Sequence, residues 1–187
     1  LRLVLWGKLA FRGSATSHVE TIRVGLLTRC GSRYPAGMSK RRQARRAAVQ
    51  LLYQAEIWGG PALPLEDVNS CLESWERDSS PDDGMRTFVI EAVYGVSERV
   101  DELDGMIAAY AQDWTIDRMP VIDKNILRLA LRELLYCSDI PWQVSINEAV
   151  ELAKRYSTPE CASFVNGVLS AVQADRPSGE SNEERDD

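Results

Sequence analysis

Histidine is almost missing from this sequence of 187 residues. The single histidine, His18, lies among the first 37 residues, which look unlike the rest, so the remaining chain holds no Cys/His or Ser/His pair for nucleophilic catalysis. The chain also lacks a glycine-rich loop of the kind that cradles phosphates. These absences exclude the common catalytic templates. A hydrolase that uses paired carboxylates stays open, but nothing in the sequence calls for one.

Long apolar runs and strand patterns are missing as well. No stretch approaches the roughly 20 apolar residues that a membrane helix needs, so we expect a soluble protein without a membrane partner. Few segments alternate apolar and polar residues as strands do. With 44% hydrophobic residues the chain can still bury a core. The length suits one domain with or without tails, and the pattern predicts an all-α fold.

The four cysteines do not form a metal-binding pattern. They are Cys30, Cys71, Cys137 and Cys161, and their spacings of 41, 66 and 24 residues match no zinc motif. No clear signal peptide precedes them, which argues against a secreted disulfide framework. Free thiols in a reducing cytosol are the simplest interpretation. We therefore predict a cytoplasmic protein with no metal and no cofactor.

Acidic residues outnumber basic ones, which by itself argues against a nucleic-acid partner. The net charge is −6, but residues 1–37 carry six Lys or Arg and one acid, Glu20. The remaining 150 residues hold 16 basic and 27 acidic residues, a net charge of −11. Within this acidic body, residues 39–46 include five cations. A concentrated basic patch on an acidic body indicates a localised anionic partner.

The two ends of the sequence differ from its middle. Residues 1–37 show no sustained hydrophobic period, and Met38 opens the basic run, so we expect a mis-called start or a disordered leader. Their Arg-rich, acid-poor composition also fits an organelle transit peptide. Residues 175–187 are polar and acidic, which predicts a disordered tail. The folded domain is predicted to span 38–174.

Seven helical segments are predicted after Ser39. Apolar residues recur at helical spacing and the connections are short, which favours antiparallel packing in bundles. Two helix starts carry specific signals. Ser145 and Glu148 have the spacing of a capping box, and Thr158 precedes Pro159 as a cap before a first-turn proline. The expected segments are 40–57, 64–76, one through Met85–Val96, one through Leu103–Tyr110, 119–137, one opened by Ser145 and one capped by Thr158.

Four arginines of the basic run form two neighbouring rows on the first helix. At about 100° per residue, Arg41 aligns with Arg45. Arg42 aligns with Arg46 beside them. Cations at the amino end of a helix oppose the helix dipole, by about 0.3–1 kcal/mol per exposed site. Such a local violation is expected at functional sites, and guanidinium groups suit phosphate oxygens and base stacking. The alternative is a solvated, charged helix terminus.

Four segments resemble sequences of the NusB family of transcription antitermination proteins. They are RRAAVQLLY at 45–53, DKNILRLALREL at 123–134, INEAVELAK at 146–154 and FVNGVL at 164–169. Their order and spacing resemble the family over about 39–173. Residues 59–84 match only in helical character, and the two ends do not match.

The resemblance implies two packed small helical bundles and a function without catalysis. It implies binding of the boxA element in ribosomal RNA leader transcripts, together with the small-subunit ribosomal protein NusE. The complex would join RNA polymerase and suppress termination, which supports ribosomal RNA synthesis. A similar domain precedes some RNA cytosine methyltransferases, but this chain ends before a methyl-donor domain could fit, so we do not expect that activity.

The resemblance also implies site residues. Tyr53 and Phe164 match aromatic positions that look like base-facing contacts, with core packing as the alternative. Asn166 and Gly167 are expected to shape the last helix for RNA, unless Gly167 only allows close helix packing. Asp123 falls where NusE would dock, although a helix-start carboxylate explains it equally well. The arginine-rich, RNA-binding start of the family falls on Lys40, Arg41, Arg42, Arg45 and Arg46.

Two other functions stay open. The first is a helical adaptor that binds other proteins, or a second copy of itself, through the same surfaces and without RNA specificity. The second is a small RNA-modifying enzyme, which the missing catalytic set disfavours. Binding of a boxA-like single strand, measured with and without NusE, separates the three.

Overall fold

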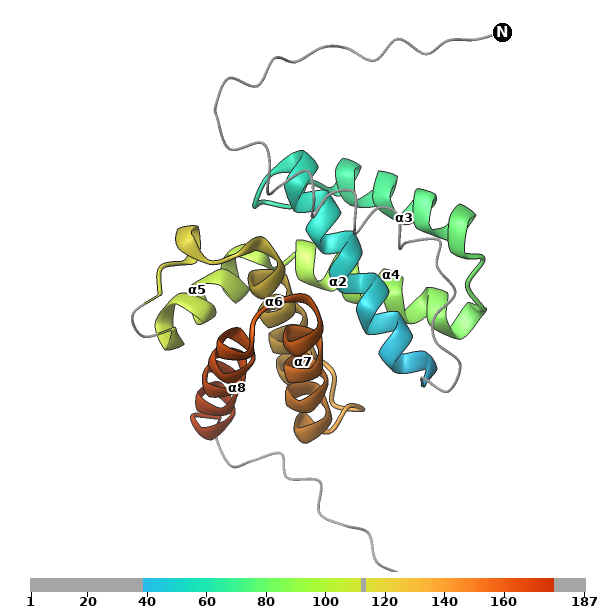
Figure 1. Ribbon diagram of the computed structural model, residues 1–187. Helices are drawn as coiled ribbons and strands as arrows, with labels where there is room; N and C mark the ends of the chain where they lie inside the picture. The colour runs from blue at the N-terminus through green and yellow to red at the C-terminus, as the bar shows by residue number, and fades with distance from the viewer. Residues whose placement is uncertain (1–38, 112–113, 177–187) are drawn as a thin grey trace, which may run out of the picture.

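The computed structural model describes residues 39–111 and 114–176, which form seven α-helices, one short 3-10 helix and no strand (Figure 1). The predicted all-α fold is confirmed. The predicted leader 1–37 and all but the first two residues of the predicted tail lie outside the described residues. None of the described helices is long and apolar enough to cross a membrane. The elements are α2 (Lys40–Gly59), α3 (Leu65–Ser79), α4 (Asp83–Ser97), α5 (Val100–Tyr110), η1 (Ile116–Arg118), α6 (Val121–Tyr136), α7 (Trp142–Tyr156) and α8 (Pro159–Ala174).

The ends of α2 follow from its sequence. The Ser39 hydroxyl oxygen accepts a hydrogen bond from the backbone N–H of Arg42, which satisfies one of the free donors at the helix start. After the helix, Gly60 adopts a φ of 89°, a left-handed value that glycine tolerates best. The apolar stripe of this helix is fully buried, and it consists of Ala44, Ala47, Ala48, Leu51, Leu52 and Ala55.

Helices α2, α3 and α4 form the first bundle. α2 packs against both of the others, and α3 and α4 pack against each other. Trp75 of α3 and Val89 of α4 are completely enclosed in the core between them. Burial of each such side chain contributes on the order of 1.5–3 kcal/mol. Figure 1 shows these helices together on one side of the molecule.

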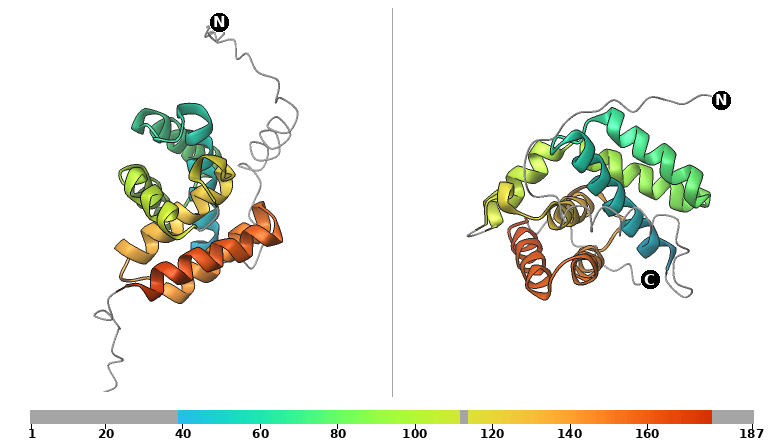
Figure 2. Two further views of the ribbon diagram at one scale, coloured as in Figure 1. Left: turned by 90° about the vertical axis from the view of Figure 1, so that its left-hand side faces the viewer. Right: turned by 45° about the horizontal axis from the view of Figure 1, so that its top comes forward.

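Helix α6 is the centre of the second bundle and the link to the first. It packs against α5, α7 and α8, and also against α2 and α4. Every residue from 123 to 131 is buried, as expected for a helix that neighbours surround on several sides. Figure 2 shows α7 and α8 lying against each other beside α6. The predicted arrangement of two packed small bundles is confirmed.

One predicted helix start is correct and one is wrong. Thr158 caps α8 by accepting from the backbone N–H of Cys161, and Pro159 occupies the first turn. The capping box of Ser145 and Glu148 is wrong, because α7 begins at Trp142, directly after Pro141. Ser145 therefore lies inside the helix, where its backbone N–H already bonds to the Pro141 carbonyl. The side chains of Ser145 and Glu148 form hydrogen bonds with residues of other helices instead.

A buried cluster of charges joins the two bundles. Glu56 of α2 pairs with Lys124 and Arg128 of α6, with N–O distances of 2.5 and 2.7 Å. Asn125 donates a further hydrogen bond to the same carboxylate at 2.7 Å. Arg128, which is completely buried, also binds Asp104 of α5 through two nitrogens, each at 2.6 Å. The cluster thus ties α2, α5 and α6 together at one point.

Candidate nucleic-acid interface

The cations at the start of α2 have carboxylate partners from distant parts of the chain. Lys40 pairs with Asp82 at 2.6 Å, and both side chains are exposed. Arg41 lies 3.9 Å from Asp139, also at the surface. These acids offset the unfavourable interaction of the cations with the dipole of α2. The basic run is therefore neither a bare cation row nor a simply solvated terminus.

Arg42 makes a two-pronged contact with Glu148 of α7. Its Nε lies 3.0 and 2.9 Å from the two carboxylate oxygens, and its second terminal nitrogen lies 2.5 Å from Oε1. The hydrogen bonds to Glu148, and then its charge, raise the pKa of the Arg42 guanidinium. The Arg42 side chain keeps 40% of its surface exposed, whereas Glu148 keeps only 12%. Arg42 can therefore still meet a ligand from solvent.

Arg45 is buried and serves as a link between α2 and α6. Its side chain is 5% exposed, and it binds the 2% exposed carboxylate of Glu133 at 2.8 Å. Ser145 of α7, a third helix, donates a hydrogen bond to the same carboxylate at 3.0 Å. The guanidinium groups of Arg41 and Arg45 also lie 5.4 and 5.5 Å from the ring centre of Phe88 on α4. Of the predicted arginines, Arg45 is the one directed into the protein.

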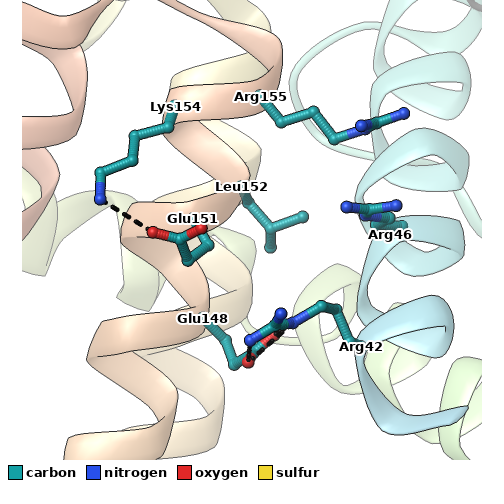
Figure 3. A pocket seen from close by; sticks show the side chains of 7 residues that line it. All are labelled: Arg42, Arg46, Glu148, Glu151, Leu152, Lys154 and Arg155. Carbon is teal, nitrogen blue, oxygen red and sulfur yellow. Dashed lines mark hydrogen bonds and ion pairs between the residues drawn. The ribbon is translucent and has the colours of Figure 1, made fainter. Parts of the chain in front are cut away.

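A pocket opens between the first half of α2 and the second half of α7 (Figure 3). Its volume of about 390 Å³ lies within the range of small-ligand pockets, about 300–1,000 Å³. Two of its walls carry cations and one buried leucine lies between them. The lining side chains are Arg42, Arg46, Glu148, Glu151, Leu152, Lys154 and Arg155.

The cations of the pocket differ in their partners. Arg42 is bound to Glu148, and Lys154 is bound to Glu151 at 2.8 Å. Arg46 has no hydrogen bond or ion pair with any carboxylate in the part of the chain that is described. Burial lowers the pKa of the half-buried Arg46 guanidinium, and the positive charge of Arg155 lowers it further.

The predicted aromatic residues lie outside this pocket. Tyr53 on α2 is half-buried, and burial raises the pKa of its hydroxyl. Phe164 on α8 is half-buried against the core, and its ring centre lies 5.5 Å from that of Trp114. Trp114 itself keeps 44% of its surface exposed. Asn166, two residues after Phe164 on α8, is exposed.

Asp123, the predicted NusE contact, is buried at the start of α6. Its exposed fraction is 1%, and one carboxylate oxygen accepts a hydrogen bond from the Ser157 hydroxyl at 3.0 Å. The other oxygen has no hydrogen-bond partner among the described atoms. The position in the first turn of α6 lets the helix dipole stabilise this negative charge. The side chain therefore offers no surface of its own in this conformation.

Three residues of this region were not singled out from the sequence. Lys154 and Arg155 lie in the last turn of α7, where cations complement the helix dipole, so their pattern indicates helix stability rather than binding. Trp114 precedes η1 in a segment without a clear period. Only the tertiary structure brings these residues beside Arg46 and Phe164. No group of three or more potential metal-ligating side chains occurs within the described ranges.

Comparisons with known proteins agree with this architecture. The sequence profile of the NusB family matches residues 42–174. Transcription antitermination protein NusB of Thermodesulfovibrio yellowstonii is 42% identical over 138 residues, which cover 71% of this chain and 91% of that protein. This relative is named as a transcription antitermination protein.

Solved structures show the same fold. T. maritima NusB superposes with a TM-score of 0.63 at 32% identity, covering 77% of this chain and 94% of that one. A chain from the crystal structure of antitermination factors NusB and NusE in complex with dsRNA has a TM-score of 0.61 at 27% identity. The match covers 73% of this chain and 98% of that one. From its sequence over residues 42–174 and from its fold, this chain belongs to the NusB family.

Proposed function

We propose that this chain is an antitermination factor that binds boxA RNA of ribosomal RNA leader transcripts together with NusE. The bound complex then joins RNA polymerase and suppresses termination, which supports ribosomal RNA synthesis. The observation that carries the proposal is a basic surface on α2 and α7 in a family member whose body is otherwise acidic. A relative of the same fold was solved with both NusE and RNA, which supports both partners.

The RNA surface begins at the amino end of α2. Arg41 and Arg42 keep 61% and 40% of their side chains exposed, so their guanidinium groups can reach phosphate oxygens. Arg46 lines the neighbouring pocket. Lys40 adds an exposed cation at the edge of this surface. Arg45 contributes by fixing α2 against α6, which sets the direction of the other arginines.

The aromatic residues extend the surface away from the cations. Trp114 exposes its ring beside Phe164, and Asn166 offers an exposed amide on the same helix. Stacking of a base on such a ring contributes about 1–3 kcal/mol and tolerates any base. Tyr53 lies on α2 two turns beyond Arg46, on the same side of the helix. Phosphate contacts would fix the strand, and these groups would contact its bases.

NusE is proposed to dock at the start of α6. Because Asp123 is buried, its carboxylate would hold the α7–α8 connection through Ser157 and shape the docking surface without touching NusE. Exposed residues just before it in the chain, such as Arg118 and Pro120, would make the contacts.

Titration of a labelled boxA-like single strand, with and without NusE, tests this function. We expect weak binding by the chain alone and tighter binding with NusE, and a strand of the same composition in scrambled order serves as control. Equal affinity for both strands in the presence of NusE would remove boxA specificity from the proposal.

The alternative function is a helical adaptor without RNA specificity. It is supported by the carboxylate groups that already form ion pairs with cations of the basic run. The same titration decides, because an adaptor would bind NusE, or a second copy of this chain, and leave the RNA free. Size-exclusion chromatography with light scattering separates the NusE complex from a homodimer.

A further inference from the structure

Two cations of the α2–α7 pocket are left without a carboxylate partner. Glu148 forms an ion pair with Arg42, and Glu151 forms one with Lys154. Neither Arg46 nor Arg155 forms an ion pair with an acidic side chain within residues 39–111 and 114–176. The guanidinium carbon of Arg155 lies 5.7 Å from the centre of the Tyr156 ring. The pocket therefore holds two cations whose charge no neighbouring group neutralises directly.

These two arginines come from opposite walls. Figure 3 shows Arg46 extending from α2 and Arg155 extending from α7 into the same part of the pocket. Burial, and then the positive charge of Arg155, lower the pKa of the Arg46 guanidinium, while the charge of Glu148 acts in the opposite direction. Like charges held together in this way are unfavourable for folding. Such a local conflict marks a site that a ligand of opposite charge completes.

The two arginines of the pocket have the chemistry to bind a phosphate group. Each guanidinium presents several N–H donors in a planar fork, and two forks from opposite sides can hold the oxygens of one phosphate. The buried side chain of Leu152 forms part of the lining and offers no competing acceptor. The two carboxylates of the lining are paired, Glu148 with Arg42 and Glu151 with Lys154.

We propose that Arg46 and Arg155 form a clasp for one backbone phosphate of the bound RNA. This inference rests on the proposed RNA-binding function and adds Arg155, a residue outside the arginine-rich start of α2, to the binding surface. Lys154, although it lines the same pocket, takes no part because Glu151 neutralises it. An isolated inorganic phosphate has the same chemistry and occupies the same clasp.

The first experiment compares two neighbouring substitutions, Arg155→Gln and Lys154→Gln. Both remove one positive charge from exposed positions at the end of α7, so they change the long-range field equally. We expect Arg155→Gln to weaken binding of every RNA about tenfold, because a charged hydrogen bond to phosphate is lost. It should flatten the slope of log affinity against log salt by up to about 0.7, the value for one phosphate of a single strand. Lys154→Gln should change affinity less than twofold. Equal losses in the two variants would show a general charge effect and overturn the clasp.

Arg46 is tested together with Arg155. If both hold one phosphate, Arg155→Gln should weaken binding much less in the Arg46→Gln background than in the natural chain. Additive losses in the double variant would mean two separate contacts and would overturn the shared clasp.

Inorganic phosphate gives a second measurement without RNA. At constant ionic strength, replacing chloride by phosphate should raise the melting temperature of the natural chain more than that of Arg155→Gln, because the general stabilisation by phosphate is common to both chains. In chloride, Arg155→Gln should melt close to the natural chain, because removal of the repulsion with Arg46 offsets the loss of a cation from the last turn of α7. Protection by phosphate with no binding of boxA RNA would keep the clasp and reject the proposed function. RNA binding that is unchanged in Arg155→Gln would keep the function and reject the clasp.

Discussion

The arginines at the start of α2 differ in what their loss should do, because burial separates them. Arg45 is 5% exposed and faces the buried carboxylate of Glu133, whereas Arg41 is 61% exposed. Arg45→Gln leaves a buried, unpaired carboxylate, which we expect to lower the free energy of unfolding by about 3–5 kcal/mol. Arg41→Gln should lower it by less than about 1 kcal/mol. Urea unfolding followed by circular dichroism measures both.

The matched control for this prediction removes both members of the buried pair. Arg45→Met combined with Glu133→Leu leaves no uncompensated charge, so its stability should exceed that of Arg45→Gln. RNA binding by this double variant then tells positioning from contact. Normal affinity would mean that Arg45 only holds α2 against α6, while a lost phosphate contact would flatten the salt dependence.

Phe164 should show two separable effects, one on folding and one on RNA. Its ring is half-buried against the core and beside Trp114, so Phe164→Ala should cost less than the roughly 3–5 kcal/mol of a fully buried phenylalanine. If a base stacks there, RNA affinity should also fall by about 1–3 kcal/mol with an unchanged salt slope. Thermal unfolding and RNA titration on the same samples separate the two. A loss of stability with normal RNA binding would assign Phe164 to the core alone.

The basic run was identifiable from the sequence, but its partners were not. Arg45 and Glu133 are 88 positions apart, and Arg42 and Glu148 are 106 apart. No local pattern connects residues at such separations, since only the packing of α2 against α6 and the nearness of α7 bring them together. The sequence does not single out Arg155 for a similar reason. A cation at the end of α7 is explained equally well by its favourable interaction with the helix dipole.

At the scale of helices, the predicted segments agree with the structure to within a few residues, except at the start of α7. There Pro141 precedes the helix and the chain turns into it at Trp142. The spacing of Ser145 and Glu148 fits a capping box, yet both side chains bond across helices, to Glu133 and Arg42. Local spacing cannot tell a cap from a tertiary contact when both use the same residue types.

The start of α4 should respond to acid. Asp82 caps this helix through the backbone N–H of Met85 and pairs with Lys40 of α2. The hydrogen bond from Lys40, and then the one from Met85, lower the Asp82 pKa below its ordinary value of 3.8. Because the pKa is lowered on folding, the stabilisation is complete well above pH 3.8 and is lost as pH falls through the lower, folded-state value.

Asp82→Asn tests this pH dependence. The substitution keeps a capping side chain but removes the charge, so its melting temperature should lie below that of the natural chain at pH 6. The difference should shrink as pH falls below 3.8. Thermal unfolding between pH 2.5 and 6 (about four steps) measures it, with Asp83→Asn in the first turn of the same helix as control. A difference that is constant across this range would contradict the assigned role of the charge.

At the scale of the whole molecule, the two bundles share one interface through α6, and charges are buried in it. Glu56 comes from the first bundle, and Lys124 and Arg128 come from the second. Three groups of α6 donate to the single carboxylate of Glu56, so its charge is compensated only when the bundles are docked. The basic surface of α2 and the basic end of α7 belong to different bundles, and this interface therefore also sets the width of the pocket between them.

Removal of the Glu56 charge should weaken the docking of the two bundles more than it weakens the packing within either bundle. Glu56→Gln leaves Lys124 buried without its partner, while Arg128 keeps Asp104, so we expect a loss of about 3 kcal/mol or more from the free energy of unfolding. Glu73→Gln on the exposed face in the middle of α3 is the control and should change it by less than about 0.5 kcal/mol. Because typical domains are stable by only about 5–15 kcal/mol, such a loss is large enough to alter cooperativity.

Two probes of unfolding show whether the bundles separate. Circular dichroism follows all helices, and tryptophan fluorescence follows Trp75, which is fully buried in the first bundle, when the other four tryptophans are replaced by Phe in every chain compared. In the natural chain both transitions should coincide in urea, as in a two-state domain. In Glu56→Gln the second bundle, which lacks the α2–α4 core, should unfold at lower urea, so the circular dichroism change should begin before the fluorescence change. Coincident transitions in the variant, with a normal stability, would show that apolar packing between α2, α4 and α6 holds the bundles together without the buried charges.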